Sequence, residues 1–314
     1  MSQCSMCGSD RATLLLRQTD RLYRTTTKEF GVVRCQQCGL IRLNPQPTPD
    51  ELRQYYPENY WFAPDRSVVA RLEEMYRRTV LQGHVRFVAR ALRGSPARGP
   101  LLDVGCGGGL FLAMMRRAGF NVVGLDNSRE AAAVAWRHHQ VPAVVADLDR
   151  APFRPGSFAG IAMSHVLEHL PDPAVYLSAA HRLLAPEGRL VIFVPNAASL
   201  QFALLGKRWN GLDVPRHLYD YRDRDVERLL NNKGFAVVRR SYFSLRDNPA
   251  GLATSLAPGL DPMARRVRKV PEGTASRLAK DLAHFALVAA ALPFTLAEAA
   301  LGAGSTVMME AKRL

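Results

Sequence analysis

A glycine-rich stretch at residues 101–109 constrains the fold more than any other part of the chain; it reads LLDVGCGGG. A short apolar run ends there in a cluster of glycines, and a helical pattern follows. This order predicts a buried parallel strand, a tight turn and the first turn of a helix. Glycines in such a turn let the backbone approach a ligand that a Cβ atom would keep away. A second apolar run ends at Asp126, where an acid suits the hydroxyls of a ribose.

The charge beside the glycines indicates which ligand the turn would take. Gly105, Gly107 and Gly109 do not keep the G-x-G-x-x-G spacing of dinucleotide-binding turns. Asp103, two residues before the first glycine, would repel a pyrophosphate and attract a ligand that carries an ammonium and a sulfonium. S-adenosylmethionine is such a ligand. The segment DVGCGGG and the later LDNS resemble the first two motifs of class I S-adenosylmethionine-dependent methyltransferases. The plainer alternative is a turn that binds another nucleotide or nothing.

The resemblance implies a set of cofactor-binding residues. In these enzymes an acid after the third strand accepts from the adenine amino group, and the backbone of its neighbour reads the ring edge; Asp147 and Leu148 match those positions. Asp147 as an ordinary turn aspartate is the alternative. Cys106 is expected to be a small residue beside the cofactor, although a thiol near a helix N-terminus can also be reactive. The cofactor-binding residues are predicted to be Asp103, Gly105, Cys106, Gly107, Asp126, Asn127, Asp147, Leu148 and His165.

Strand-like and helix-like segments alternate over residues 99–245. This alternation predicts an α/β fold, a parallel sheet with helices on both faces and ligands at the carboxyl ends of its strands. The resemblance adds a final antiparallel strand within residues 304–314, which makes a Rossmann-like, mostly parallel sheet of seven strands. Residues 45–98 are predicted to be a linker followed by a helical segment, and residues 246–303 a helical insertion before the last strand. An aromatic group in the linker is predicted to pack between domains or to cap a ligand: Tyr55, Tyr56, Tyr60, Trp61 and Phe62.

Two C-x-x-C pairs lie near the start of the chain, Cys4 with Cys7 and Cys35 with Cys38. Four thiolates at this spacing suit a tetrahedral Zn²⁺ site. We therefore predict a zinc ribbon over residues 1–44, whose stability would come largely from the metal. Four reduced cysteines without metal are the alternative.

The segment after the fourth strand, SHVLEHLPDP at residues 164–173, resembles the corresponding motif of ubiquinone-type O-methyltransferases. The methyl group leaves the cofactor at this edge of the sheet. Three roles stay open: His169 or His165 as a general base, a divalent metal held by His165, Glu168 and His169, or a purely structural cap. His165 stands where some relatives carry Glu, which weakens the metal alternative.

A second polar cluster, DVPRHL at residues 213–218, follows the fifth strand. It resembles a subgroup of the same enzymes that often has an N-terminal zinc ribbon. His217 is the strongest candidate here for a base or substrate ligand, and Arg216 could bind an anionic group. The alternative is a structural pair of Arg216 with Asp213 and a packed His217. The predicted catalytic residues are His217, His169 and Glu168.

The chain is strongly basic, with a formal net charge of +14. Nucleic acid, an anionic membrane surface or a phosphorylated substrate would suit that charge. The arginines are spread out, which favours an ordinary solvated surface. The basic and then apolar residues 264–303 suggest peripheral membrane contact, a lid or a homodimer interface. His284, Pro293 and Glu298 argue against a membrane span. The chain start has no secretory signal pattern, so we expect a cytoplasmic location.

These features favour an S-adenosylmethionine-dependent methyltransferase with a small-molecule biosynthetic substrate, lipid- or sugar-linked, and O-methylation with a histidine base. Zinc-ribbon sugar C-methyltransferases are similar at the N-terminus but carry a large further C-terminal domain. An RNA base methyltransferase that grips phosphates through the ribbon is the second hypothesis. The third is a non-catalytic protein that keeps the fold.

Overall fold

The structure is a computed structural model and describes residues 3–56 and 68–314. Tyr60, Trp61 and Phe62, which the sequence places in an aromatic cluster, lie outside the described residues. The chain divides into two compact units. The first comprises Met1–Tyr60, Pro195–Asp225 and Asp247–Val307, and the second comprises Trp61–Val194, Val226–Arg246 and Met308–Leu314.

The second unit contains a seven-stranded sheet in the order β10-β11-β8-β7-β4-β5-β6. Its strands are β4 Leu101–Val104, β5 Val122–Asp126, β6 Ala143–Val145, β7 Phe158–Ser164, β8 Leu184–Pro195, β10 Phe235–Ser241 and β11 Thr306–Arg313. β4 pairs in parallel with β5 and β7, whereas β11 pairs antiparallel with β10. The predicted Rossmann-like sheet of seven mostly parallel strands is therefore confirmed.

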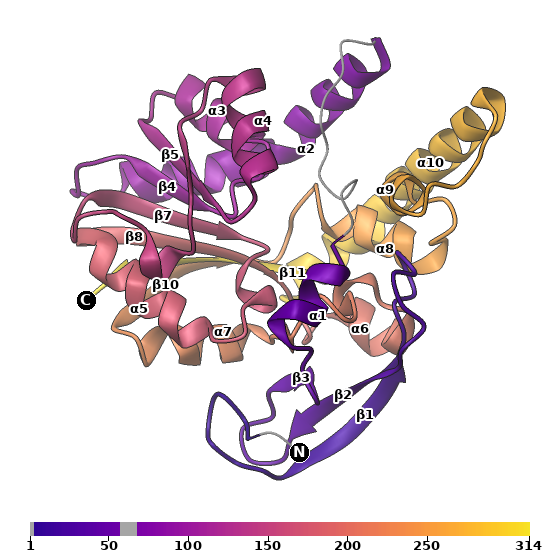
Figure 1. Ribbon diagram of the computed structural model, residues 1–314, viewed down its shortest axis with the longest axis horizontal. Helices are drawn as coiled ribbons and strands as arrows, with labels where there is room; N and C mark the ends of the chain where they lie inside the picture. The colour runs from indigo at the N-terminus through magenta and orange to yellow at the C-terminus, as the bar shows by residue number, and fades with distance from the viewer. Residues whose placement is uncertain (1–2, 57–67) are drawn as a thin grey trace. The chain divides into compact units, whose positions relative to one another are not determined.

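Helices cover both faces of this sheet. They are α2 Val68–Arg93, α3 Leu110–Arg117, α4 Arg129–His139, α5 Pro173–Leu183 and α7 Asp223–Asn231. Figure 1 shows α2, α3 and α4 on one face and α5 on the other. Sequence signals start these helices: Ser128 caps α4, and Asp172 caps α5 ahead of a proline at its first turn. Their apolar sides form a core against the sheet that includes Leu112 and Met115 of α3, both fully buried.

The first unit holds a smaller antiparallel sheet of four strands in the order β1-β2-β3-β9. They are β1 Ala12–Gln18, β2 Phe30–Cys35, β3 Ile41–Leu43 and β9 Tyr219–Asp220. The first three belong to the predicted ribbon. β9 comes from the segment that follows DVPRHL and pairs Tyr219 with Arg42 and Asp220 with Ile41. The ribbon sheet is thus completed by residues far along the chain, which the sequence did not indicate.

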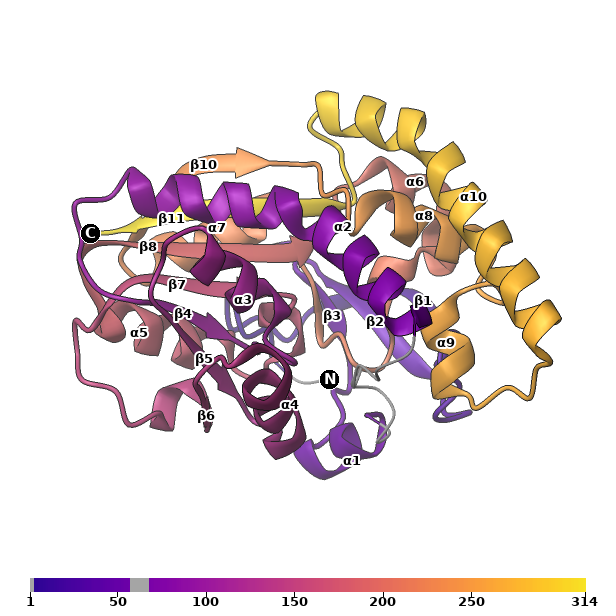
Figure 2. The same ribbon diagram turned by 90° about the horizontal axis from the view of Figure 1, so that it is seen from above.

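The remaining elements of the first unit are helical. They are α1 Pro49–Gln54, α6 Leu200–Leu205, the short 3₁₀ turns η4 Gly206–Arg208 and η5 Asn210–Leu212, α8 Asn248–Leu256, α9 Pro262–Val267 and α10 Thr274–Ala300. α1 begins at a capping box, because Thr48 and Glu51 each accept from the other's backbone amide. α10 packs against α8, and Figure 2 shows it as one long helix. The predicted helical insertion at 246–303 corresponds to α8, α9 and α10.

Residues 195–225 group with the ribbon and the helical insertion in the structure, whereas the sequence pattern places them in the core domain over 99–245. The reason is physical pairing: β9 adds to the ribbon sheet, and Gln201 of α6 donates to Glu298 of α10 over 2.6 Å. The strand-and-helix alternation alone could not show that this stretch leaves the sheet.

Candidate active site

The glycine turn between β4 and α3 has the conformation that its residues predict. Gly105 has φ +71°, and a Cβ atom there would lie 2.8 Å from Cγ2 of Val166. Gly109 has φ +77° at the N-terminus of α3, and a Cβ atom there would lie 2.8 Å from the side chain of Ala135. Larger residues would therefore be strained twice, by backbone conformation and by contact. The turn follows the carboxyl end of β4, where ligands of such sheets bind.

Asp103 is the most informative residue of this region. It is buried, 4% exposed, and its Oδ1 accepts no hydrogen bond from any residue that the structure describes. Burial, reinforced by the nearby carboxylate of Asp126, raises the pKa of Asp103 to about 8, with Arg246 acting in the opposite direction. A buried oxygen without a donor is costly in a folded protein. An ammonium group supplied by a ligand would satisfy it and ionise it.

Asp126 ends β5, next to the glycine turn in the sheet. Its Oδ2 accepts from the amide of Gly107 at 2.9 Å and its Oδ1 from the amide of Ser128 at 2.9 Å. Burial raises its pKa although these amides act to lower it. Each carboxylate oxygen keeps a second lone pair, so the group can still accept from a hydroxyl. Asn127 follows with an exposed side chain.

Asp147 follows β6, at the same edge of the sheet. Its side chain is exposed, and Oδ1 accepts from the hydroxyl of Tyr176 on α5 at 3.1 Å. Leu148 is fully buried and begins the 3₁₀ turn η2 Leu148–Arg150. The tyrosine therefore fixes the orientation of the carboxylate that the sequence assigns to adenine. Burial and Asp147 together raise the pKa of Tyr176, so its hydroxyl stays a donor.

The segment after β7 places His165 and Glu168 against each other. Nδ1 of His165 lies 3.2 Å from Oε1 of Glu168, which is 1% exposed on its side chain. If Nδ1–H donates to this carboxylate, the neutral ring carries its lone pair on Nε2. His165 also has φ +54°, a strained conformation for a residue other than glycine. His169 ends the 3₁₀ turn η3 Leu167–His169 and is half-buried.

Cys106 is a packed thiol. It is buried in the core of the second unit, and a Cβ atom on Gly124 would lie 2.6 Å from its Sγ. Burial, followed by the charges of Asp103 and Asp126, raises its pKa. A thiol held protonated is a poor nucleophile, which favours the predicted role of a small residue in the turn.

The four N-terminal cysteines lie together in the first unit. One ligand atom from each of Cys4, Cys7, Cys35 and Cys38 lies within 4.8 Å of the others. The Sγ atoms of Cys4 and Cys38 are 3.6 Å apart, as are those of Cys7 and Cys35. Tetrahedral zinc with Zn–S bonds of about 2.3 Å separates its sulfurs by roughly 3.8 Å. Burial acts to raise the pKa of Cys35, but the amides of Cys38 and Gln37 outweigh it and lower the value to about 6. The donor set and its geometry fit zinc.

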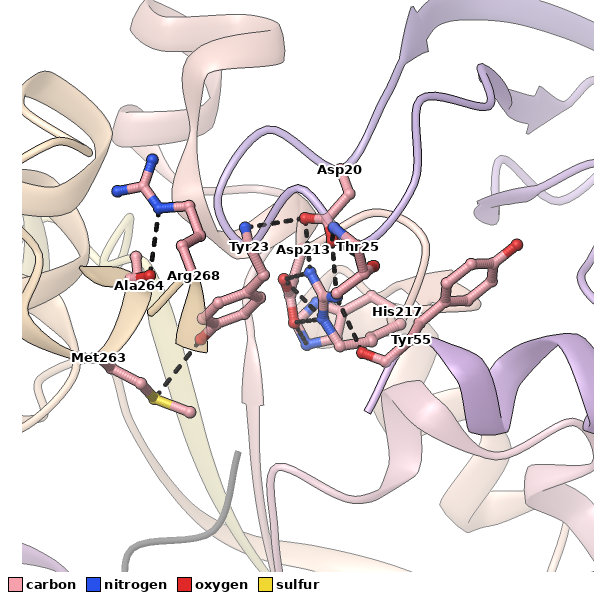
Figure 3. Close-up of polar contacts among 10 residues, drawn as sticks. Asp20, Tyr23, Thr25, Tyr55, Asp213, His217, Met263, Ala264 and Arg268 are labelled. Atoms are coloured by element: carbon pink, nitrogen blue, oxygen red, sulfur yellow. Dashed lines mark hydrogen bonds and ion pairs between the residues drawn. The ribbon is translucent and has the colours of Figure 1, made fainter. Parts of the chain in front are cut away.

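The DVPRHL segment holds a buried ion-pair network in the first unit, drawn in Figure 3. Arg216 is fully buried and donates to Asp213 at 2.8 Å and to both oxygens of Asp20 at 2.9 and 3.0 Å. It also donates to the carbonyl of Tyr55 and lies over the ring of Tyr23. The guanidinium is therefore used within the protein, and the structural pair with Asp213 is the alternative that the structure supports.

His217 lies beside this network. Its ring is 7% exposed, and Nδ1 donates to the carbonyl of Gly211 at 2.8 Å. The bond to Gly211 sets the orientation of the ring. Nε2, the other ring nitrogen, lies 4.0 Å from Oδ2 of Asp213. His217 belongs to the first unit, whereas His165, Glu168 and His169 belong to the second.

α10 is long and apolar enough to cross a membrane by length and composition, with 22% of its most apolar window buried. Its buried residues include Thr295 and Glu298, and Pro293 lies inside it. Glu298 is 1% exposed and accepts from Gln201. Such polar anchoring is typical of a helix that packs on its own protein.

Two residues of the region were missed by sequence reasoning. Arg246 acts on the charge of Asp103 from 143 positions along the chain, and Tyr176 orients Asp147 from a helix face. Neither carries a motif. The helical spacing of apolar residues on α5 indicates which of its sides is buried, and it is the one signal in the sequence for the position of Tyr176.

Comparison with known proteins identifies the family. A family described as "Methyltransferase domain" matches residues 73–240, more than half of the chain. A ubiquinone biosynthesis O-methyltransferase from Pseudomonas aeruginosa is 34% identical over 130 residues, 39% of this chain and 56% of that protein. Its counterpart in Xanthomonas axonopodis pv. citri is 34% identical over 147 residues, 44% and 62% respectively. The chain thus matches little more than half the length of these relatives.

Solved structures share the fold at low sequence identity. An S-adenosylmethionine-dependent methyltransferase from Archaeoglobus fulgidus has a TM-score of 0.50 and 18% identity, covering 79% of this chain and 100% of that one. Geranyl diphosphate C-methyltransferase from Streptomyces coelicolor, in complex with Mg²⁺, geranyl diphosphate and S-adenosyl-L-homocysteine, has a TM-score of 0.53 and 15% identity, covering 85% and 99%. With the glycine turn, the acids beside it and the family match in agreement, this chain belongs to the methyltransferase domain family and is a class I S-adenosylmethionine-dependent methyltransferase.

Proposed function

We propose that this methyltransferase acts on a hydroxyl of a small biosynthetic molecule that is lipid- or sugar-linked. The named relatives are O-methyltransferases of ubiquinone biosynthesis, which supports oxygen as the acceptor atom. The fold neighbour from Streptomyces coelicolor was solved with a small lipid diphosphate, which supports a substrate of that size class. The observation that carries the cofactor assignment is the buried Asp103 oxygen beside the glycine turn.

The residues at the carboxyl ends of the strands would each bind a different part of the cofactor. Asp103 would take the ammonium, Asp126 the ribose hydroxyls, and Asp147 with the backbone of Leu148 the adenine edge. The turn residues Gly105, Cys106 and Gly107 would approach through backbone, and Asn127 and His165 would border the site. When bound, S-adenosylmethionine supplies an electrophilic methyl group for an in-line displacement. The contribution of the protein is alignment of the acceptor with that group.

A histidine would take the proton of the acceptor hydroxyl. His169 and His217 are the candidates, because imidazole titrates near neutral pH. Glu168 would act by holding His165 in one tautomer, as its contact with Nδ1 suggests. A divalent metal on the carboxylate and imidazole groups of the loop is the alternative use of the same residues.

We further propose that the ribbon cysteines hold one zinc ion with a structural role. Four thiolates close the coordination shell and leave no position for a substrate. The metal would tie the start of the chain to the turn between β2 and β3.

The proposed location is the cytoplasm, with α10 in contact with an anionic membrane surface. Leu278 and Leu282, one helical turn apart, are 59% and 61% exposed. The chain carries a net charge of +14, and Lys269 is exposed in the loop before the helix. An exposed apolar helix face with basic residues nearby is typical of interfacial binding.

The test is transfer of radiolabelled methyl groups from S-adenosylmethionine into fractionated cell extract. We expect label in the small-molecule or lipid fraction, and a rate reduced at least about 100-fold by His169→Gln or by His217→Gln, whichever is the base. Label in RNA would support the RNA base methyltransferase instead. Cofactor binding without label in any fraction would support a non-catalytic protein.

A further inference from the structure

Four arginines meet around one hollow in the first unit, and none of them is among the site residues assigned above. A cavity of about 270 Å³ is lined by Arg21, Arg24, Arg208, Ser255, Pro258, Gly259 and Arg268. The arginines come from the β1–β2 connection, from η4 and from the residue after α9. Segments far apart in sequence therefore bring four positive charges to one place.

The charges of this arginine hollow are not neutralised within the protein. None of the four arginines forms an ion pair with a residue that the structure describes. The acids that act on Arg268 at longer range, Asp261 and Asp20, have other partners. Asp261 accepts from the amide of Ala264 and the hydroxyl of Thr254, and Asp20 is held by Arg216. Burial and the neighbouring arginines lower the pKa of both Arg21 and Arg268.

Two of the arginines are held by backbone carbonyls, and the other two are exposed. Arg21 donates to the carbonyls of Arg208 at 2.6 Å and Ser255 at 2.9 Å. Arg268 donates through Nε to the carbonyl of Ala264 at 3.1 Å, as Figure 3 shows. That bond leaves its two terminal amino groups for a ligand. The side chains of Arg24 and Arg208 are exposed.

The loop that carries Arg21 and Arg24 is held by hydrogen bonds to the side chain of Asp20. Asp20 accepts hydrogen bonds from the amides of Tyr23 and Thr25, and Arg216 donates a further hydrogen bond to its carboxylate. Arg24 has φ +57°, a conformation that glycine or asparagine would adopt at lower cost. A preorganised loop that presents charges to a hollow binds with less loss of conformational entropy.

We propose that the arginine hollow binds the phosphoryl groups of a diphosphate ester. Guanidinium forks donate in pairs to phosphate oxygens, and several of them match a group that carries more than one negative charge. The hollow lies just under the roughly 300 Å³ at which pockets for whole small molecules begin. It therefore suits a charged head group, and the rest of the ligand would lie outside.

The lining argues against nucleic acid. Single-stranded nucleic acid is bound by a basic track with aromatic side chains on which bases stack. The described lining of the hollow contains serine, proline and glycine besides the arginines, and no aromatic residue. That the diphosphate belongs to the methyl acceptor rests on the proposed function. The binding site itself does not.

The test is titration calorimetry of the full-length protein with inorganic pyrophosphate, at constant ionic strength and without S-adenosylmethionine. The site variant is Arg24→Gly with Arg208→Gln. Glycine removes one charge and suits the positive φ, and the backbone carbonyl that holds Arg21 is kept. The matched control is Arg90→Gln, an exposed arginine that lines a separate groove on α2. Thermal unfolding checks that every variant is folded.

We expect pyrophosphate to bind more tightly than orthophosphate, and the site variant to lose at least about tenfold in affinity while Arg90→Gln keeps it. A second arm uses phosphatidylcholine vesicles with and without diacylglycerol pyrophosphate, a lipid that carries a diphosphate ester. Binding of these vesicles that is lost in the site variant alone assigns the phosphoryl group to a lipid head group; binding of pyrophosphate without vesicles assigns it to a soluble ester.

Absence of both kinds of binding overturns the proposal, as does an equal loss in Arg90→Gln. Competition by a single-stranded oligonucleotide that is stronger than by pyrophosphate overturns it in favour of nucleic acid. Because no methyl transfer is measured, failure here is distinguishable from failure of the proposed function.

Discussion

At the scale of single residues, the protein uses buried charges in two ways. Arg216 has both of its described carboxylate partners, Asp20 and Asp213, inside the first unit, whereas Asp103 has an oxygen that no described residue satisfies. The first arrangement stabilises the fold. The second is typical of a ligand site, where the missing partner arrives with the ligand.

Arg216→Met is expected to destabilise the protein by about 3–5 kcal/mol, because Asp20 and Asp213 would be left as buried charges without their cation. Urea unfolding measures this. The matched control is Arg53→Met, whose partner Asp50 is exposed, and which should change stability by less than about 1 kcal/mol. Equal effects of the two substitutions would contradict a structural role for the network.

The network also has a predicted acid dependence. Although burial acts to raise the pKa of Asp20, Arg216 outweighs it and lowers the value. The stabilisation is therefore complete above the unfolded-state pKa near 3.9 and is lost as pH falls through the folded-state value. We expect the wild-type protein to lose stability below about pH 4 more steeply than Arg216→Met, in unfolding followed by circular dichroism.

At the scale of elements, β4, the glycine turn and α3 together form the predicted cofactor-binding segment. Gly105→Ala is expected to cost about 1–2 kcal/mol from its positive φ, and to weaken S-adenosylmethionine binding because the new Cβ presses on Val166. Gly156→Ala is the matched control, since Gly156 has φ +70° with nothing within 4 Å of its Cβ position. It should show the stability loss alone. Weakened cofactor binding in both variants would contradict the role of the turn.

The ribbon is the second element with a direct prediction. We expect one zinc ion per chain by atomic emission spectroscopy, lost in Cys35→Ser, with a fall in melting temperature after chelation. The control is Cys106→Ser, because Cys106 lies in the other unit and outside the cysteine cluster. Full stability of protein that contains reduced thiols and no metal would contradict the zinc site.

Elements with a regular local sequence pattern can be predicted from the sequence. Elements and contacts that depend on pairing between distant segments cannot. β4 and β5 lie where the sequence predicts strands, because an apolar run that ends at a glycine turn or at an acid is a local signal. β9 has only two residues and exists because β3 pairs with it. The role of Arg216 depends on Asp20, 196 positions away. The arginine hollow depends on three connections that carry no motif.

At the scale of the whole molecule, some basic residues are neutralised by ion pairs and others are not. Arg265 is buried against Glu272 and Asp281, and Lys280 also pairs with Glu272. Arg265 is therefore neutralised, whereas Arg268 of the same basic segment lines the arginine hollow and has no ion pair with a described residue. The apolar side of α10 then has to be tested separately from that charge.

Leu278→Ser with Leu282→Ser is expected to reduce binding to phosphatidylglycerol-containing vesicles by at least about 100-fold in a co-sedimentation assay, because about 0.8 kcal/mol is lost per CH₂ group withdrawn from the membrane and each serine removes about three carbons. Leu14→Ser, an equally exposed leucine on β1 at 49% exposure, is the matched control. Wild-type protein that stays in solution, or that forms a dimer through α10 in sedimentation velocity, would contradict membrane contact.

The central claim is that Asp103 takes up the positive charge of S-adenosylmethionine, and calorimetry of cofactor binding from pH 6 to 9 tests it most directly. With its pKa near 8 in the free protein, Asp103 is mostly protonated at pH 7 and must release its proton to hold an ammonium. We therefore predict affinity that rises up to about tenfold per pH unit until pH 8, release of close to one proton at pH 7, and no such rise below pH 8 in Asp103→Asn. Wild-type affinity that does not change with pH, or binding of NAD in place of S-adenosylmethionine, would contradict the account.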